Sequence, residues 1–482
     1  MAKLSLKQRA IRGGFWVFMA RIISRAFSFL RLIILARLLV PEDFGLMGIA
    51  LLSLATLETF SETGFSQALI QKQRVSQRDL DATWTVAIIR GFILFSVLFL
   101  LAPYLAIFFN SPQAELVVRL IAFGLLFNSL TNSGIIFFQK EIDFKSQFFY
   151  QLTGDLTDFI VVISLALLWR NVWALVFGFL AGALVKMAFS YLIHPYRPRW
   201  RWDKQRTREL FQFGKWIFLA NLIIFFLTQG DDAFVGKFLG VAALGFYQVA
   251  YRLSNLPATE ITHIISRVTF PAYSKLQKNL TQFREAYLNT LSFVSFIAFP
   301  LVLGLFVLAP EVVKILLGDK WLPIIPALRI LSLFGIIRAI TGVGGSVILA
   351  AGKPQLIAYV TSIQLAIMAG LIYPFSVRWN ITGVSLIVFL VSLISLPAQY
   401  LIIKQVKLGW GKWLKTLSPP VIASVLMALV LMVLKYFLRT TSLVSLMFLI
   451  FLGMVIYSGL LYGLAKKRLI AFKGVLEKQW LI

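Results

Sequence analysis

The sequence predicts an all-α, polytopic membrane protein with about 14 transmembrane helices. Of the 482 residues, 59% are hydrophobic and only 14% are charged, and the mean hydropathy is +0.84. A soluble core grows too slowly with chain length to bury that much apolar surface. Apolar runs of about 20–28 residues, the length that crosses a bilayer as a helix, recur along the whole chain.

The predicted spans follow one another with mostly short loops, several of which contain Pro or Gly. The first span is too long and too rich in arginine for a cleavable signal peptide, so we expect it to remain as a membrane anchor. In chain order the spans are 13–39, 44–70, 82–109, 115–138, 147–169, 172–193, 211–238, 243–269, 286–309, 322–350, 355–375, 381–403, 414–437 and 442–465.

The distribution of Lys and Arg sets the orientation of these spans. Basic residues gather at both ends of the chain and in alternate loops, whereas the opposite loops hold few. By the positive-inside rule both termini are therefore cytoplasmic. The net charge of +27 then reflects membrane topology and does not indicate a nucleic-acid partner. The chain has no Cys and only two, widely separated His residues, which predicts neither disulfides nor a metal site, and no cofactor.

An internal duplication is suggested by identities at a constant offset of 200 residues. The matched residues are Gly14, Trp16, Ala20, Arg37, Gly45 and Ala50 with Gly214, Trp216, Ala220, Lys237, Gly245 and Ala250. Arg119 and Arg329, which open the fourth span of each half, match more loosely. We therefore expect two pseudo-symmetric six-helix bundles around a central cavity, as in transporters built from parallel repeats. The domains would be 1–196, a basic cytoplasmic linker at 197–209, 210–404, and two further helices with a basic tail at 405–482.

The first span carries an unusual stripe of charge. Arg21, Arg25 and Arg31 fall on one helical face together with two serines. A guanidinium facing lipid costs at least about 2.5–3.5 kcal/mol, so three on one face predict a helix that lines a polar cavity and binds an anion. Arg37, Lys186, Lys215 and Lys237 lie nearer span ends, where long side chains reach the interface.

Other intramembrane charges are also functional candidates. They are Glu58, Glu62, Arg90, Asp155, Asp158, Asp231, Asp232, Arg252, Glu260, His263 and Arg338. Asp155 and Asp158 suit either a transport role or structural pairing with Arg90 or the first-span arginines. Asp231 and Asp232 equally suit pairing with Arg31 or Arg252. His263 could titrate near neutral pH and serve proton coupling, although a satisfied buried histidine also fits the pattern.

No pattern favours an enzyme. The loops hold no Ser/His/Asp set, nucleotide-binding loop or metal-ligand spacing. The glycine cluster at Gly342, Gly344 and Gly345 lies in an apolar helix without a preceding strand, so we interpret it as a site of helix packing or a hinge.

The segment ARLLVPEDFGLMGIALLSLATLETFSETGFSQALIQKQ at 36–73 resembles the polysaccharide transport family within the multidrug/oligosaccharidyl-lipid/polysaccharide exporter superfamily. Nearly the whole chain looks like the colanic acid, O-antigen and teichuronic acid exporter type. The resemblance implies a V-shaped pair of bundles around a basic cavity in the bacterial inner membrane. It also implies an undecaprenyl-pyrophosphate-linked oligosaccharide as substrate, and a groove for its lipid tail at 414–465.

The sequence hypothesis is therefore a lipid-linked oligosaccharide flippase that works by alternating access. Arg21, Arg25, Arg31, Arg252 and Arg338 would hold the pyrophosphate, because the planar guanidinium suits phosphate oxygens. The acidic residues and Arg90 would gate the cavity or couple transport to H⁺ or Na⁺, and membrane lipids and other polysaccharide assembly proteins are further partners. Two alternatives stay open: a cation-coupled multidrug exporter of the same superfamily, and a scaffold subunit of a polysaccharide assembly complex that transports nothing.

Overall fold

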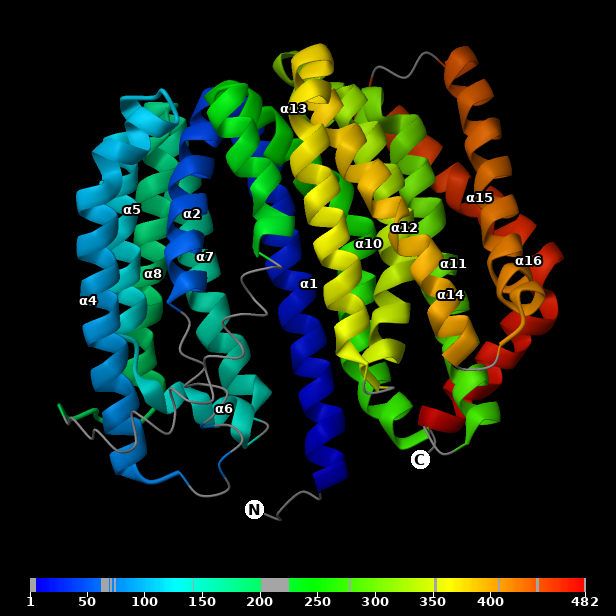
Figure 1. Ribbon diagram of the computed structural model, residues 1–482, viewed down its shortest axis with the longest axis horizontal. Coiled ribbons are helices and arrows are strands. Elements are labelled where there is room, and N and C mark those ends of the chain that lie inside the picture. Colours follow the sequence, from blue (N-terminus) through cyan, green and yellow to red (C-terminus); the bar gives the residue numbers. More distant parts are fainter. Residues whose placement is uncertain are drawn as a thin grey trace. The chain divides into compact units, whose positions relative to one another are not determined.

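The computed structural model describes residues 6–61, 69, 72, 75–141, 143–200, 225–276, 279–350, 353–405, 408–438 and 442–480. These residues are almost entirely helical, as Figure 1 shows. The chain divides into two compact units, Met1–Gly245 and Phe246–Ile482. The predicted all-α class is confirmed. The predicted domain boundary at 197–209 extends into residues outside the described part and stays a prediction.

The first unit is a bundle of long helices around α5 and α7. α7 packs against α8 and α1, and α5 packs against α2, α4 and α8. Its helices are α1 (Leu6–Leu38), α2 (Pro41–Phe60), α4 (Gln77–Phe108), α5 (Gln113–Ser129), α6 (Ile136–Lys140), α7 (Phe144–Trp169), α8 (Trp173–Ile193) and a further stretch at 225–238.

The second unit is centred on α11, which packs against α12 and α15. A buried hydrogen bond from Trp413 Nε1 to Tyr287 Oη (3.1 Å) ties α15 to α11, and one from Tyr457 Oη to the Phe296 carbonyl (2.8 Å) ties α16 to it. The helices are α10 (Val241–Leu276), whose first five residues, up to Gly245, belong to the first unit, then α11 (Leu280–Val312), α12 (Ile325–Ala350), α13 (Pro354–Leu393), α14 (Ser395–Gln405), α15 (Trp410–Leu438) and α16 (Leu443–Trp480).

Each of the fourteen predicted spans coincides with a helix over most of its described residues. Within the described ranges, nine helices are long and apolar enough to cross a membrane, and a bent pair, Gln113–Ser129 with Ser133–Lys140, makes ten. The predicted count is higher for four reasons. α1 carries four arginines within its predicted span, and α10 carries polar residues such as Arg252, Asn255 and Glu260 within its own. The predicted span 211–238 lies partly outside the described residues, and α13 joins two spans. α13 is interrupted at Asn380, whose φ of 52° turns the chain between them.

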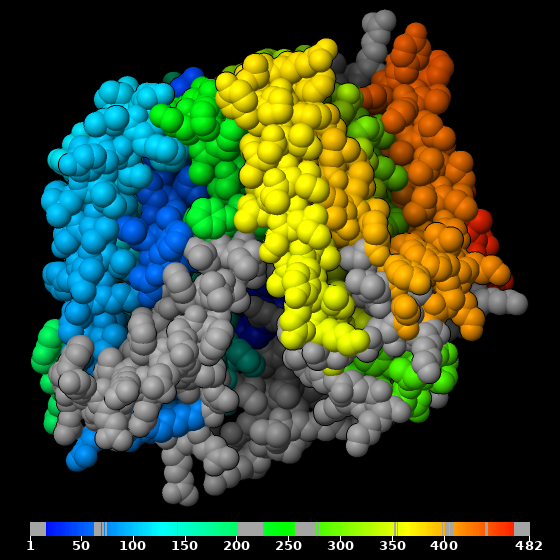
Figure 2. All heavy atoms as spheres, viewed as in Figure 1, coloured from blue at the N-terminus to red at the C-terminus, as the bar shows by residue number. Residues whose placement is uncertain are grey.

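The surface of the helices agrees with a lipid environment. Large apolar side chains are exposed along α4 and α15, which Figure 2 shows at the surface in light blue and orange-red. Examples are Phe92, Ile93, Leu100, Ile107, Val421, Leu429, Val433 and Phe437. Soluble proteins rarely expose such large continuous apolar faces to water, so the protein is a multi-pass membrane protein.

The beginning of the segment 36–73, from which the family resemblance was inferred, has a clear structural role at the start of α2. Pro41 occupies the first turn, where its missing N–H costs nothing. The buried Asp43 carboxylate accepts the Val40 N–H (3.1 Å) and satisfies the helix N-terminus. A Cβ at Gly45 would overlap the Val241 carbonyl, and a Cβ at Gly245 would overlap the Pro41 carbonyl. Gly45 and Gly245 are 200 residues apart, and so are Pro41 and Val241, so the contact between α2 and the first turn of α10 is reciprocal and follows the duplication.

A Gly45→Ala substitution is expected to destabilise the protein by about 1–3 kcal/mol, because the obstructing atoms belong to backbone and cannot turn aside. The unfolding temperature in detergent measures this effect. Gly345→Ala is the matched control, since nothing lies within 4 Å of a Cβ there and alanine favours a helix interior. A Gly45→Ala protein as stable as the wild type would contradict the close contact.

A second likeness supports the duplication. The Arg119 guanidinium lies over the Phe99 ring at 5.2 Å in the first unit, and the Arg329 guanidinium lies over the Phe306 ring at 5.9 Å in the second. Each arginine stands on the helix after the one that carries its aromatic partner. These are the two arginines that the sequence matched more loosely, and they make the same kind of contact.

Candidate functional site

A network of four charged side chains joins α1, α7 and α8 in the first unit. Arg31 Nη1 lies 2.6 Å from Asp158 Oδ2, and Lys186 Nζ lies 2.9 Å from Asp155 Oδ1. Ser24 donates a hydrogen bond of 2.7 Å from its hydroxyl to the other oxygen of Asp155. Two cations and two carboxylates therefore balance, on the face of α1 that the arginine stripe occupies.

This network answers two questions that the sequence left open. Asp158 pairs with a first-span arginine, which was one of the predicted alternatives, so Arg31 pairs with α7 and not with Asp231 or Asp232. The expectation that Lys186 reaches the membrane interface is wrong. Its side chain crosses α7 at Gly154, where a Cβ would overlap the lysine methylenes, and turns inward to Asp155.

The charges of the network depend on one another. The side chains of Arg31 and Asp158 are only 28% and 18% exposed, and those of Lys186 and Asp155 are 33% and 30% exposed. A partly buried charge that loses its partner is strongly destabilising, whereas a balanced set is tolerated. Arg25, on the same helix, is exposed, and Arg21 is half-buried. α1 thus presents both a paired arginine and an exposed one.

Arg90, on α4, lies against the C-terminus of α2. Its guanidinium donates to the Glu58 carbonyl (3.0 Å) and to the Ser61 hydroxyl (2.9 and 3.1 Å). A cation at the C-terminus of a helix is favoured by the unpaired carbonyls and the helix dipole. The Glu58 carboxyl lies beside Asn128 and within the field of Arg90. These contacts join Arg90 to α2 and the turn at its C-terminus, whereas the sequence analysis had considered Asp155 and Asp158 as its partners. Glu62 lies outside the described residues.

Arg338 is the centre of a second polar cluster, in the second unit. Its Nη1 donates to Asn255 Oδ1 (2.9 Å) and Tyr251 Oη (3.3 Å) of α10. Its guanidinium also lies over the Phe334 ring, 5.3 Å from the centroid. All these partners are uncharged. Arg252 is exposed on α10, and the side chains of Glu260 and His263 lie outside the described part.

Asp231 and Asp232 lie on the helical stretch 225–238. Asp231 is buried, with 3% of its surface exposed, and its carboxylate accepts the Asp232 N–H at 3.1 Å. Their predicted pairing with Arg252 stays a prediction. Across the described residues, no group of three or more His, Cys, Asp or Glu side chains is placed to hold a metal ion.

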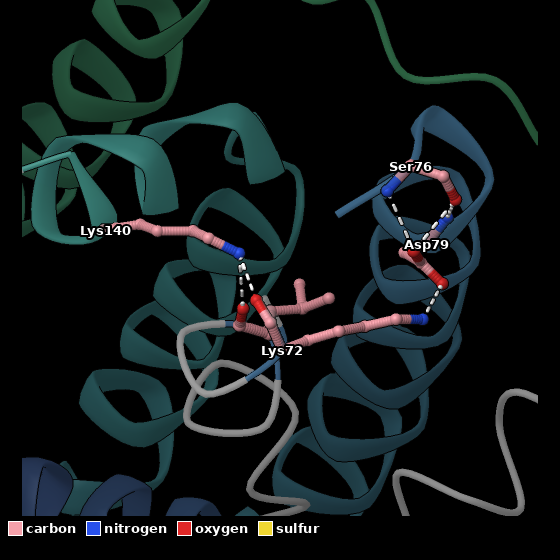
Figure 3. Close-up of polar contacts among 5 residues, drawn as sticks. Lys72, Ser76, Asp79 and Lys140 are labelled. Carbon is pink, nitrogen blue, oxygen red and sulfur yellow. Dashed lines mark hydrogen bonds and ion pairs between the residues drawn. The ribbon is translucent and has the colours of Figure 1, made fainter. Parts of the chain in front are cut away.

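Two further acidic residues, which the sequence analysis missed, fix loops at the start of α4. Figure 3 shows that the Asp79 carboxylate accepts hydrogen bonds from Ser76 and forms an ion pair with Lys72 (2.9 Å). Lys140 donates to the backbone carbonyls of Leu69 and Lys72. The spacing Ser76-x-x-Asp79 is a capping-box pattern and could have revealed this start.

Asp81, two residues after Asp79, contacts the beginning of the basic linker. Its carboxylate accepts the Tyr196 hydroxyl and the Arg199 N–H (3.0 Å). Burial and the Asp81 carboxylate raise the pKa of Tyr196, so its hydroxyl remains a donor. Burial also lowers the pKa of His194, whose neutral Nδ1 accepts the Tyr196 N–H (3.2 Å). The first residues of the linker are thus fixed to the first unit.

Comparison with known proteins agrees with this architecture. A family profile described as polysaccharide biosynthesis protein matches residues 34–326. An uncharacterized membrane protein in the cps region of Klebsiella pneumoniae is 25% identical, over 98% of this chain and 99% of its own length. The lipopolysaccharide biosynthesis protein WzxC of Escherichia coli is 26% identical, over 73% of this chain and 72% of its own. Among solved structures, the lipid II flippase MurJ in an inward closed conformation has a TM-score of 0.74 at 15% identity, with 93% of this chain and 98% of that one covered. The last likeness confirms the fold.

Proposed function

Since the matched profile covers more than half of its length, the chain belongs to the polysaccharide biosynthesis protein family, and we propose that it flips lipid-linked oligosaccharides across the membrane. The substrate would carry its sugars on undecaprenyl pyrophosphate and pass from the cytoplasmic to the outer leaflet. The chain acts as a transporter and not as an enzyme, as its named relatives in polysaccharide biosynthesis and its flippase-like fold support.

The observation that carries this proposal is the arginine stripe of α1 with its partners on α7 and α8. A pyrophosphate can leave the headgroup region only if fixed cations replace its water. Arg25 would meet the phosphate first, because it is exposed, and Arg31 would follow when Asp158 releases it. Arg21, Arg252 and Arg338 complete the proposed set of phosphate-binding residues.

Alternating access follows from exchange of ion-pair partners. A ligand shifts a conformational equilibrium only through its different affinities for the two states. The bound pyrophosphate would compete with Asp158 for Arg31 and so favour the state in which the network of α1, α7 and α8 is rearranged. The freed carboxylates would then take up H⁺ or Na⁺, which is how transport would be coupled to an ion gradient. Glu58, Glu62, Asp231, Asp232, Glu260 and His263 are the other proposed gating or coupling groups, and Arg90 would hold α2 during the change.

We also propose that the protein lies in the bacterial inner membrane with both termini in the cytoplasm. The basic loops and ends support this orientation. The lipid-linked substrate would come from glycosyltransferases on the cytoplasmic side and pass to polymerising proteins on the other, which are the expected assembly partners.

The proposal is tested with purified protein in vesicles that contain a lipid-linked oligosaccharide with a fluorescent sugar. We expect the wild type to expose the sugar to an external quencher far faster than empty vesicles do, and to respond to an imposed pH or Na⁺ gradient. Vesicles that move no lipid-linked sugar would support a scaffold role instead. Protection of cells against cationic dyes without movement of the sugar lipid would support a drug exporter.

A further inference from the structure

The cluster around Arg338 departs from the internal duplication in a way that points to a ligand. Tyr251 and Asn255 stand where the offset of 200 places Leu51 and Ala55 in the first half. The offset of 210 that relates Arg119 to Arg329 places Gly124 and Asn128 opposite Phe334 and Arg338. The duplication retains the structural contacts of Gly45, Gly245, Arg119 and Arg329, but all four members of this cluster differ between the halves.

The cluster is built on two facing helices. Tyr251 and Asn255 are one turn apart on α10, and Phe334 and Arg338 are one turn apart on α12. The Tyr251 and Phe334 rings lie 6.5 Å apart, between centroids, at an angle of 46°. All four side chains are half-buried, so each keeps part of its surface accessible.

Arg338 differs from Arg31 in the groups that surround its positive charge. Arg31 lies against a carboxylate, whereas Arg338 is held by an amide oxygen, a phenol oxygen and an aromatic face. Among the described residues Arg338 has no acidic partner, and its Nε and Nη2 donate to none of them. The neutral contacts therefore fix the orientation of the guanidinium, while its positive charge and its Nε–H and Nη2–H donors remain available to a ligand.

We propose that Tyr251, Asn255, Phe334 and Arg338 form a subsite for the first sugar of the lipid-linked substrate and the phosphate attached to it. This inference rests on the proposed function. Arg338 would bind the phosphate oxygen next to the sugar. The aromatic rings would pack against the apolar face of the pyranose. The Asn255 amide is oriented by its nitrogen, which donates to the Tyr251 carbonyl (3.0 Å), and its oxygen, which accepts from Arg338, would accept a second hydrogen bond from a sugar hydroxyl. Aromatic surface with a few oriented polar groups is typical of small-molecule sites. The subsite would select among sugars, because a hydroxyl that leaves an oriented polar group unpaired is rejected.

The experiment compares binding of two kinds of probe to the protein in nanodiscs. One probe is sugar-free undecaprenyl pyrophosphate, and the others are undecaprenyl pyrophosphates that carry glucose, galactose or N-acetylglucosamine. We expect the wild type to bind at least one sugar-bearing lipid about tenfold more tightly than the sugar-free lipid. Tyr251→Leu with Asn255→Ala, which installs the residues of the first half, should reduce this ratio of affinities to about one. Because both residues also orient Arg338, the readout is the ratio between sugar-bearing and sugar-free lipid and not the affinity for either alone.

Two single variants and a control complete the test. Tyr251→Phe keeps the aromatic ring and should retain most of the preference for the sugar-bearing lipid. It is the variant to measure if the double variant folds poorly. Arg338→Gln should weaken binding of every probe. Arg329→Gln, on the same helix and also half-buried over an aromatic ring, should change neither affinity nor preference. Unfolding temperatures identify variants that fail to fold.

The outcomes separate the two proposals. If the wild type binds sugar-free and sugar-bearing lipids equally, or if the double variant keeps the preference, the sugar subsite is overturned and the flippase proposal stands. If the wild type binds neither kind of lipid and moves none, the proposed function fails and the subsite fails with it.

Discussion

An Arg25→Ala variant is expected to fold and reach the membrane in normal amounts but to move lipid-linked oligosaccharide about 10- to 100-fold more slowly. The side chain of Arg25 is exposed, so its truncation leaves no packing cavity. What it would remove is the proposed charge-assisted contact to phosphate, and such contacts contribute about 1.5–3 kcal/mol. The rate of sugar exposure in vesicles and the amount of membrane-inserted protein measure the two halves of this expectation.

Arg37→Ala is the matched control for Arg25→Ala. Arg37 is also an exposed arginine of α1, but it lies in the last turn, off the stripe. We expect this variant to transport nearly as the wild type does. Wild-type transport by Arg25→Ala, or an equal loss in both variants, would remove Arg25 from the substrate path.

Neutralising the pair of Arg31 and Asp158 is expected to stop transport and to affect stability in a coupled way. Arg31→Gln and Asp158→Asn each leave a partly buried charge without its partner in this ion pair, so each should lower the unfolding temperature. The double variant should recover part of this loss, with a coupling free energy of about 0.5–3 kcal/mol. Transport should not recover in the double variant, because the proposed exchange of partners needs both charges.

The ion pair of Lys435 and Glu311 provides the control. Lys435 Nζ lies 3.3 Å from Glu311 Oε1, and the two side chains are 23% and 15% exposed, so the pair resembles Arg31 and Asp158 in burial. It joins α15 to α11, and neither of these helices carries a residue of the proposed phosphate-binding set. The same double-mutant cycle should give coupling in stability but leave transport intact. Recovery of transport in the double variant of Arg31 and Asp158 would show that this pair only holds helices together.

Much of the fold followed from local properties of the chain. A transmembrane helix is specified by the length of an apolar run, and a loop by its Pro, Gly and charge, so the spans could be predicted one at a time. The start of α2 was also local, because Pro41 and Asp43 satisfy the helix end through neighbours in sequence. The duplication was visible as well, since Gly45 and Gly245 stay glycine where backbone meets backbone.

The candidate site could be predicted only in part. The stripe of arginines on α1 was visible, because residues three and four apart share a helix face. The partners were visible only as one of several alternatives, since Ser24 and Asp155 are 131 positions apart and meet through the packing of α1 on α7. Lys186 was misplaced for the same reason. Its position near the end of a span suggested the interface, whereas its side chain passes over Gly154, which has no Cβ to block it, and pairs with Asp155.

The sequence by itself determined that this protein is a helical membrane protein of duplicated design with cations on its first helix, because hydrophobic length, period and net charge are properties of neighbouring residues. Only the tertiary structure decided which charges neutralise one another and which stay available. Arg31 and Arg338 look alike in the sequence, but one faces a carboxylate and the other an amide and two aromatic rings. The physical reason is that pairing depends on how each helix is rotated against its neighbours, and that rotation is fixed by contacts far apart in the chain.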